Sequence, residues 1–251
     1  MSPVTVLVPT FNEEGNLRDC LESVKWADEI LLVDCGSTDR TLEIAREYGA
    51  RILRHPYENS AAQKNWAIPQ ATHDWVLVVD ADERVTPELQ VEISRIARNT
   101  TVSRPGYWIR RRNFFLGREI RYCGWQRDRV LRLFEKDEGR YESRRVHAEI
   151  QLCRAGVLHG SLLHYSYRTL GDYLTKADRY ASWGVGDLLE AGKRTGPVGI
   201  LGHAAFRFVK MYLLQRGFLD GAHGLVLSVL GSFTVFLKYA KLWEMRRARH
   251  G

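Results

Sequence analysis

The first ninety residues alternate short apolar runs with amphipathic segments, and this alternation restricts the possible folds more than any other feature. The apolar runs cover residues 4–9, 29–34, 50–55 and 75–79. The last of these runs, WVLVV, is apolar on both faces, so a strand there has no face suited to water. Strands of this kind, alternating with helices, are typical of a parallel sheet covered on both sides. We therefore expect a doubly wound α/β core over about the first half of the chain.

The intervening segments carry helix signals. Residues 12–24 place apolar side chains at i, i+3, i+4 and i+7, a spacing that predicts one buried helix face; these side chains are Leu17, Cys20, Leu21 and Val24. Ser37 or Thr38 is expected to cap the next helix, because a hydroxyl accepts from the free N–H groups of a first turn. Thr86 is expected to cap a later helix that has Pro87 at its first position.

Charge and cysteine content restrict the partners and the compartment. The net charge of +7 and the pI near 9.3 favour an anionic partner: a nucleotide, a phosphorylated glycan, a nucleic acid or an anionic membrane. The four cysteines form no C-x-x-C pair, and the N-terminal residues lack the pattern of a secretion signal. A reducing cytoplasmic location is the default expectation.

Acidic and polar residues stand at the carboxyl ends of the expected strands, where open α/β sheets bind their ligands. No G-x-G-x-x-G loop and no P-loop is present, so the pattern favours neither a dehydrogenase nor a P-loop enzyme. Asp80 and Asp82, two residues apart in extended chain, point the same way. Together they would hold Mg²⁺ or Mn²⁺, which prefer carboxylate oxygens. The alternative is that these acids solvate a loop and favour the following helix N-terminus.

Four ordered segments between residues 4 and about 90 resemble the family 2 glycosyltransferases of the GT-A fold: VTVLVPTFNEEGNL, EILLVDCGSTDRT, QKNWAI and VLVVDADE. The resemblance implies a Rossmann-like, mostly parallel sheet with flanking helices, a nucleotide-sugar donor, a divalent metal and inversion at the anomeric carbon. Later segments are similar to the bacterial subgroup that adds glucose to the inner core of lipopolysaccharide: GWQRDRVLRLF, RRVHAEI, LLHYSYRTLGDYLTKADRYA and GFLDGAHGL.

The resemblance also implies roles for individual residues. Those expected to bind the donor are Pro9, Thr10, Asn12, Glu14, Asp34, Lys64, Asp80 and Ala81. Asp34 would accept the imide N–H of uracil, with helix entry as its alternative role, and Lys64 would meet phosphate or belong to a solvated helix face. The metal ligands would be Asp82, Asp80 and His164, although a histidine on an apolar segment also fits a satisfied core residue.

The acceptor side needs a carboxylate base. Asp128 is the first candidate, and a surface ion pair with Arg127 or Arg129 is its alternative. Glu149 is the second, although Ala148 separates it from His147, where the subgroup usually has the two adjacent. Trp125 and His147 are expected to contact the acceptor, the indole ring by stacking on a sugar.

The C-terminal part changes character. We expect residues 1–170 to form the transferase core, including the acceptor segment, and residues 171–251 to form a helical region. GLVLSVLGSFTVFL is shorter than the about 20 apolar residues of a spanning helix, and cationic residues surround it: Arg207, Lys210, Arg216, Lys238, Lys241, Arg246 and Arg247. The segment therefore fits either helices in the membrane interface or core helices on the sheet.

The sequence thus predicts a metal-dependent inverting hexosyltransferase, peripheral on the inner face of the cytoplasmic membrane. Its expected donor is a UDP-sugar, with UDP-glucose the first choice, and its expected acceptor is a lipopolysaccharide core or another lipid-linked glycan. A catalytically silent nucleotide-sugar scaffold is an alternative. A basic nucleic-acid-binding protein is another, but it leaves the acids at the strand ends unexplained.

Overall fold

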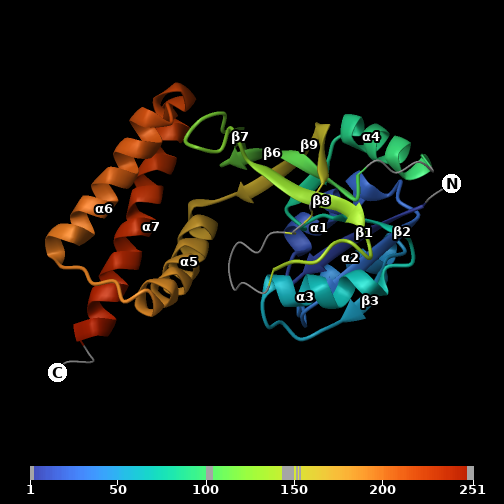
Figure 1. The fold of residues 1–251 in the computed structure, drawn as a ribbon, viewed down its shortest axis with the longest axis horizontal. Coiled ribbons are helices and arrows are strands. Elements are labelled where there is room, and N and C mark those ends of the chain that lie inside the picture. The colour runs from blue at the N-terminus through green and yellow to red at the C-terminus, as the bar shows by residue number, and fades with distance from the viewer. Residues whose placement is uncertain (1–2, 100–103, 143–149, 151, 153, 248–251) are drawn as a thin grey trace. The chain divides into compact units, whose positions relative to one another are not determined.

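The computed structural model describes residues 3–99, 104–142, 150, 152 and 154–247 (Figure 1). These residues form two compact units. The first comprises residues up to Arg111 together with Asp128–His164, and the second comprises Arg112–Arg127 together with the chain from Tyr165 onward. Residues 112–127 thus group with the C-terminal helices, whereas the sequence-based division at residue 170 assigns them to the core.

Four parallel strands begin the sheet, in the order β3-β2-β1-β4. They are β1 (Val4–Thr10), β2 (Glu29–Asp34), β3 (Arg51–Arg54) and β4 (Trp75–Val78). The register places Thr10 opposite Asp34, so the loops after β1 and β2 start side by side. The expected parallel α/β core is confirmed.

The remaining strands make antiparallel pairs, β4 with β8, β8 with β6, β6 with β7, and β9 with β5. They are β5 (Glu83–Val85), β6 (Gly106–Phe115), β7 (Arg118–Glu119), β8 (Arg129–Glu135) and β9 (Ala155–Tyr167). The main strand order is β3-β2-β1-β4-β8-β6-β9-β5. The chain enters the second unit along β6 and again along β9.

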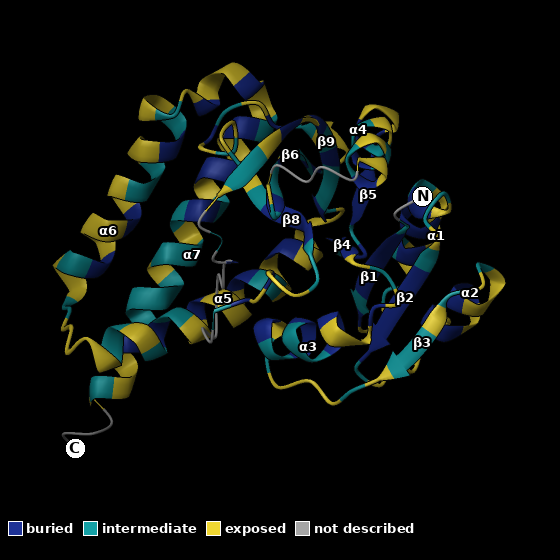
Figure 2. Cartoon of the chain, turned by 45° about the vertical axis from the view of Figure 1, so that its right-hand side comes forward, coloured by how far each residue is buried: buried dark blue, intermediate teal, exposed yellow. Residues whose placement is uncertain are grey.

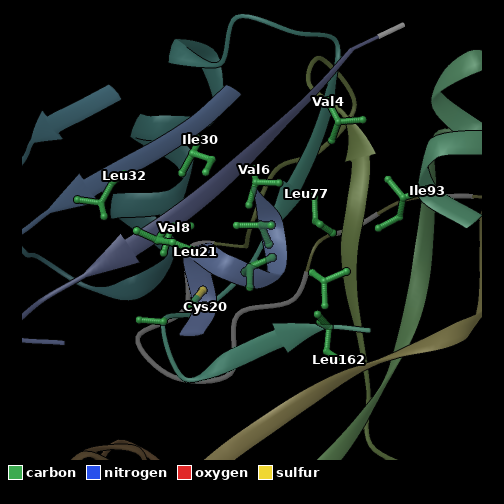
Figure 3. Packing of buried hydrophobic residues seen from close by; sticks show 14 of the residues in the cluster. Val4, Val6, Val8, Cys20, Leu21, Ile30, Leu32, Leu77, Ile93 and Leu162 are labelled. Atoms are coloured by element: carbon green, nitrogen blue, oxygen red, sulfur yellow. The ribbon is translucent and has the colours of Figure 1, made fainter. Parts of the chain in front are cut away.

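Helices cover both faces of the parallel strands. They are α1 (Glu14–Val24), α2 (Thr41–Glu47), α3 (Ser60–Ala67) with the 3₁₀ turn η1 (Ile68–Gln70), and α4 (Pro87–Arg98). Alternate residues of β1 enter different layers: Val6 and Val8 pack with α1 and α4 side chains (Figure 3), and Leu7 packs with those of α3 and η1. Figure 2 shows that β1 and β2 are buried along most of their length. Burial on both faces is why these strands lack a polar alternation.

Local signals predicted the buried face of α1 and the start of α4 correctly, and the start of α2 incorrectly. The four apolar residues of α1 are fully buried as expected, and the Thr86 hydroxyl accepts from the Leu89 N–H with Pro87 in the first turn of α4. The capping prediction for α2 is wrong, because this helix begins at Thr41 and has no side-chain cap. The Ser37 oxygen instead accepts the Asn12 N–H, and its hydroxyl donates to Asp34.

The second unit is mostly helical. Its helices are α5 (Leu170–Glu190), α6 (Pro197–Val209), the π-helical turn η2 (Lys210–Leu214), the 3₁₀ turn η3 (Gly217–Asp220) and α7 (Gly221–Arg247). Thr169 and Asp172 form a capping box at the start of α5. The buried carboxylate of Asp220 accepts the backbone N–H groups of Arg121 (3.0 Å) and Tyr122 (2.9 Å), which fastens residues 112–127 to η3.

The α7 helix is longer than the sequence suggested. The apolar clusters expected to be too short to span belong to one helical stretch over residues 217–247, long and apolar enough by length and composition to cross a membrane. Only 22% of its most apolar window is buried. Glycine, serine and threonine residues occur between the apolar residues, and the helix continues through them. Two of the glycines are close-packed: Gly224 lies against the Gly217 carbonyl and Gly231 against Met211.

Candidate functional site

The ends of β1 and β2 form a polar turn around Asp34, which is fully buried. Its Oδ1 accepts from the hydroxyls of Thr10 (3.4 Å) and Ser37, and its Oδ2 accepts the N–H groups of Gly36 (2.8 Å) and Ser37 (3.0 Å). These donors compensate for the burial of the charge. In this conformation the carboxylate holds the turn together and is not exposed to a ligand.

The segment after β1 is clamped to the loop after β2. The Asn12 N–H donates to Ser37 Oγ, and Asn12 Oδ1 accepts the Thr38 N–H, both at 2.9 Å. Glu14 Oε2 accepts the Arg40 N–H at 3.1 Å. Asn12 has φ of +54°, a left-handed conformation that asparagine tolerates better than most residues. Two expected donor-binding residues, Asn12 and Glu14, therefore also shape this loop pair.

Asp80, at the carboxyl end of β4, lies between two buried cations. Its Oδ1 is 3.0 Å from Lys64 Nζ, and its Oδ2 pairs with Arg132 Nη2. The side chains of Lys64 and Arg132 are only 7% and 6% exposed. Lys64 belongs to α3 and Arg132 to β8, so the packing of both elements beside β4 creates the pair. Lys64 Nζ also lies 5.4 Å from the ring centroid of Tyr141.

Glu83 connects the Asp80 ion pairs to Asp128, the first candidate for the catalytic base. The fully buried Glu83 accepts the Asp80 N–H (3.0 Å) through Oε2, and its Oε1 lies 3.3 Å from Arg132 and 3.5 Å from Arg111. Arg111 in turn makes a two-pronged contact with Asp128, Nε to Oδ2 and Nη2 to Oδ1, both at 3.0 Å. Positively and negatively charged side chains thus alternate along one connected network, in the order Lys64, Asp80, Arg132, Glu83, Arg111 and Asp128. The partner of Asp128 in this contact is Arg111, where the alternative had named Arg127 or Arg129.

Mutual pairing keeps the buried groups charged. Burial alone would raise the pKa of Asp80, but Arg132 and then Lys64 hold that pKa well below its usual range. Burial alone would lower the pKa of Arg132, yet Asp80 and Glu83 raise it well above its ordinary value. For Arg111 the lowering by burial is likewise outweighed, first by Glu83. Asp80, Arg132 and Arg111 therefore stay ionised at neutral pH.

Asp82 and His164 form a separate pair at the same end of β4. His164 lies opposite Glu83 in the β5–β9 ladder, and its Nε2 is 3.6 Å from Asp82 Oδ2. This spacing fits two ligands of one divalent cation, whose other ligands would be phosphate oxygens and water. Within the described part of the chain, no group of three histidine, cysteine or acidic side chains is placed to hold a metal. Asp80 fits the metal less well, since two cations already neutralise it.

The side chains of the other expected site residues that the structure describes take no part in the ion pairs of these two clusters. Pro9 is half-buried within β1, and the methyl group of Ala81 lies in the core. Trp125 belongs to the second unit, where it packs against the cluster that contains Phe115 and Tyr173. His147 and Glu149 lie outside the described residues, so their predicted roles stay predictions.

The sequence marks Glu83 as one of the acids after β4 and Arg111 as part of a basic run, but it did not predict that they join the site through Arg132, nor that Tyr141 lies beside Lys64. A signal was present for one of them, because Arg132 interrupts the apolar strand RVLRLF and a charge in such a strand needs a partner. Arg111 has no such signal, since it stands in a run of three arginines. Only the pairing of β6 with β8 brings it to Asp128.

The chain is similar in sequence to a protein family and to several known proteins. The model of the family described as "Glycosyl transferase family 2" matches residues 5–158. An uncharacterised glycosyltransferase of Rickettsia typhi is 29% identical over 257 aligned residues, covering 98% of this chain and 88% of the relative. The lipopolysaccharide core biosynthesis glycosyltransferase LpsC of Rhizobium meliloti is 27% identical over 252 residues, covering 96% and 92%.

Among solved structures, S. aureus TarS 1–349 in complex with UDP is similar over 98% of this chain and 92% of that chain, with 15% identity and a TM-score of 0.49. The family match covers more than half of the residues and spans every element from β1 to the start of β9. The mixed α/β sheet with flanking helices agrees with the GT-A fold that the sequence resemblance implies. The chain belongs to glycosyltransferase family 2 and is a glycosyltransferase.

Proposed function

We propose that the chain transfers glucose from UDP-glucose, with inversion at the anomeric carbon, to a lipopolysaccharide core or another lipid-linked glycan. One observation carries the proposal: the Asp82–His164 pair and the charge network that ends at Asp128 both start from the carboxyl end of β4. In open α/β sheets this end of the strands is where ligands bind.

Asp82 and His164 are the residues that would hold Mg²⁺ or Mn²⁺. When bound, the cation would neutralise charge on the diphosphate leaving group. The Lys64 ammonium and the Arg132 guanidinium lie beside this end of β4, where Asp80 and Glu83 pair with them. Their pairing with Asp80 fixes both cations in place before substrate arrives, which lowers the reorganisation needed for catalysis.

Asp128 is the base in this proposal. Its carboxylate takes the proton of the acceptor hydroxyl while that oxygen forms a bond to C1 of the sugar. The bond between C1 and the phosphate oxygen breaks, and UDP leaves with the bonding electrons. The two-pronged contact with Arg111 holds the carboxylate in one orientation. Glu149 remains the second candidate.

The clamped loops after β1 and β2 would hold the nucleoside. Pro9, Thr10, Asn12 and Glu14 match the family segment at this place, and the side chains of Asn12 and Glu14 are exposed. Asp34 supports a uridine base in one of two ways, by direct acceptance of the imide N–H after Ser37 turns away or by ordering the turn.

Two observations support a lipopolysaccharide or other phosphorylated acceptor: the similarity to LpsC and the net positive charge of the chain. The relative LpsC, named for lipopolysaccharide core biosynthesis, aligns over 96% of the chain, including the helical region outside the family model. The net charge of +7 favours a phosphorylated acceptor and a location on the inner face of the cytoplasmic membrane. Trp125 and His147 are the proposed acceptor contacts.

A thermal-shift screen of UDP-glucose, UDP-GlcNAc and other nucleotide sugars, with and without Mn²⁺, tests the donor. At a ligand concentration one hundred times Kd the midpoint should rise by about 5 to 11 °C. The same samples, incubated with a lipopolysaccharide core acceptor, should release UDP. Donor binding without turnover would identify a silent scaffold, and salt-dependent oligonucleotide binding without donor binding would favour the nucleic-acid alternative.

A further inference from the structure

We propose that the outer faces of α6 and α7 insert together into one leaflet of an anionic bilayer and hold the protein there mainly by burial of apolar side chains. The inference specifies the membrane partner of the proposed function. It is tested by lipid binding alone, so its failure is separable from failure of the transferase proposal.

The outer face of α6 is apolar and open. Val198 is 86% exposed, and Leu201 and Phe206 are each 62% exposed. No charged residue occurs from Pro197 to Phe206. A helix face that meets water normally carries charged side chains, so this face is suited to another environment.

The α7 helix presents a second apolar face of the same kind. Leu225, Val229, Phe233 and Phe236 follow one another at spacings of four, four and three residues, and all are exposed. This spacing places them along one side of a helix. Figure 2 shows exposed positions along α6 and partly exposed positions along α7.

The inner sides of the two helices already contact each other. The Ser232 hydroxyl donates to the Ala204 carbonyl at 2.8 Å, and His203 stacks on Tyr239 with ring centroids 4.0 Å apart. Gly231 and Ala204 are buried. The exposed apolar residues of α6 and α7 are therefore not needed for the contact between the two helices.

Charge distribution selects the bilayer over a second copy of the chain. Cationic side chains flank the apolar stretches of both helices: Lys193, Arg194, Arg207, Lys210, Arg216, Lys238 and Lys241. Anionic headgroups complement such a border. If two copies of the chain paired through this face, the cationic residues of one copy would lie close to those of the other, and their repulsion would be unfavourable.

The length of α6 indicates insertion without crossing. Together with the π-helical turn η2, it covers residues 197–214, at most about 27 Å at 1.5 Å per residue and short of the ~30 Å hydrocarbon core; Lys210 also lies within this stretch. Because α7 packs beside α6, a shallow position for α6 favours a shallow position for α7. Apolar insertion of this kind resists salt, whereas attraction to headgroups alone is lost when the Debye length falls to about 3 Å at 1 M salt.

Vesicle co-sedimentation of the full chain tests the proposal, with phosphatidylcholine–phosphatidylglycerol vesicles in 0.1 M and 1 M NaCl. Leu201→Glu and Phe206→Glu are the test variants. Val91→Glu is the matched control, because Val91 is a 49% exposed apolar residue on α4 in the first unit. Circular dichroism verifies that each variant is folded, and light scattering after gel filtration gives the mass without lipid.

We expect wild type and Val91→Glu to remain vesicle-bound at both salt concentrations, and each α6 variant to bind at least about tenfold more weakly. Loss of wild-type binding at 1 M NaCl would show that headgroup attraction alone holds the protein, and would overturn the proposal. So would equal binding by all variants. A dimer without lipid that Leu201→Glu converts to a monomer would assign this face to a second copy instead.

Discussion

Replacing Asp80 by asparagine should destabilise the fold, although Asp80 belongs to the D-x-D motif expected to bind the donor and the metal. The change leaves Lys64 and Arg132 buried with their shared counter-charge removed. Breaking a buried ion pair at one partner costs about 3 to 5 kcal/mol, and the 31% exposure of the Asp80 side chain lowers that cost. Arg132 keeps Glu83 at 3.3 Å and Lys64 keeps the ring of Tyr141, so we expect a value near the lower end.

Chemical unfolding in urea, followed by circular dichroism, measures this loss, and thermal unfolding should show a midpoint lower by roughly 6 to 20 °C. Glu43→Gln is the matched control, because it breaks the Arg40–Glu43 pair, whose side chains are 65% and 57% exposed. An exposed pair contributes little to stability, so the control should unfold at the wild-type midpoint. Equal stability of Asp80→Asn and Glu43→Gln would refute the reasoning from burial.

The pH dependence gives an independent check on the same group. The pKa of Asp80 is held below its ordinary value in the folded state, so its stabilising contribution is fully present above the unfolded value, about 3.9. That contribution is lost as the pH falls through the lower folded pKa. The deficit of Asp80→Asn should therefore be constant from pH 7 to pH 5 and shrink below about pH 4. A deficit that shrinks already near pH 6 would contradict this assignment.

Three further outcomes follow from the site and from the packing of α7. Asp82→Asn should abolish metal-dependent transfer while the unfolding midpoint stays near wild type, and full activity with Mg²⁺ or Mn²⁺ would exclude Asp82 as a ligand. Asp128→Asn should lower turnover by about 10²-fold or more with little change in donor affinity, whereas loss of turnover in Glu149→Gln alone would transfer the role of base. Gly224→Ala should cost about 1 to 3 kcal/mol in urea unfolding, because its new methyl group would overlap a backbone carbonyl of η3. Gly186→Ala on α5, where a methyl group meets nothing within 4 Å, should not destabilise, and equal losses in both would refute the packing argument.

Local patterns in the sequence were sufficient for the parallel half of the sheet. The strands at β1, β2 and β4 are apolar on both faces because both faces are buried, and the spacing of Leu17, Cys20, Leu21 and Val24 marks the buried side of α1. The cap of α4 at Thr86 depends only on residues within one helical turn. The cap expected for α2 failed because the helix begins only at Thr41 and the Ser37 oxygen accepts the Asn12 N–H from a distant part of the chain.

The arrangement of charge at the site was decided by the tertiary structure. Asp80 pairs with Arg132, 52 residues later in the chain, and Arg111 with Asp128, 17 residues later. No local pattern encodes such partners, because the order β4-β8-β6 brings them together. The same holds for His164, which reaches Asp82 through the ladder of β5 with β9. Residue types and short spacings therefore determined which groups are available, and strand order determined which of them share a buried environment and neutralise one another.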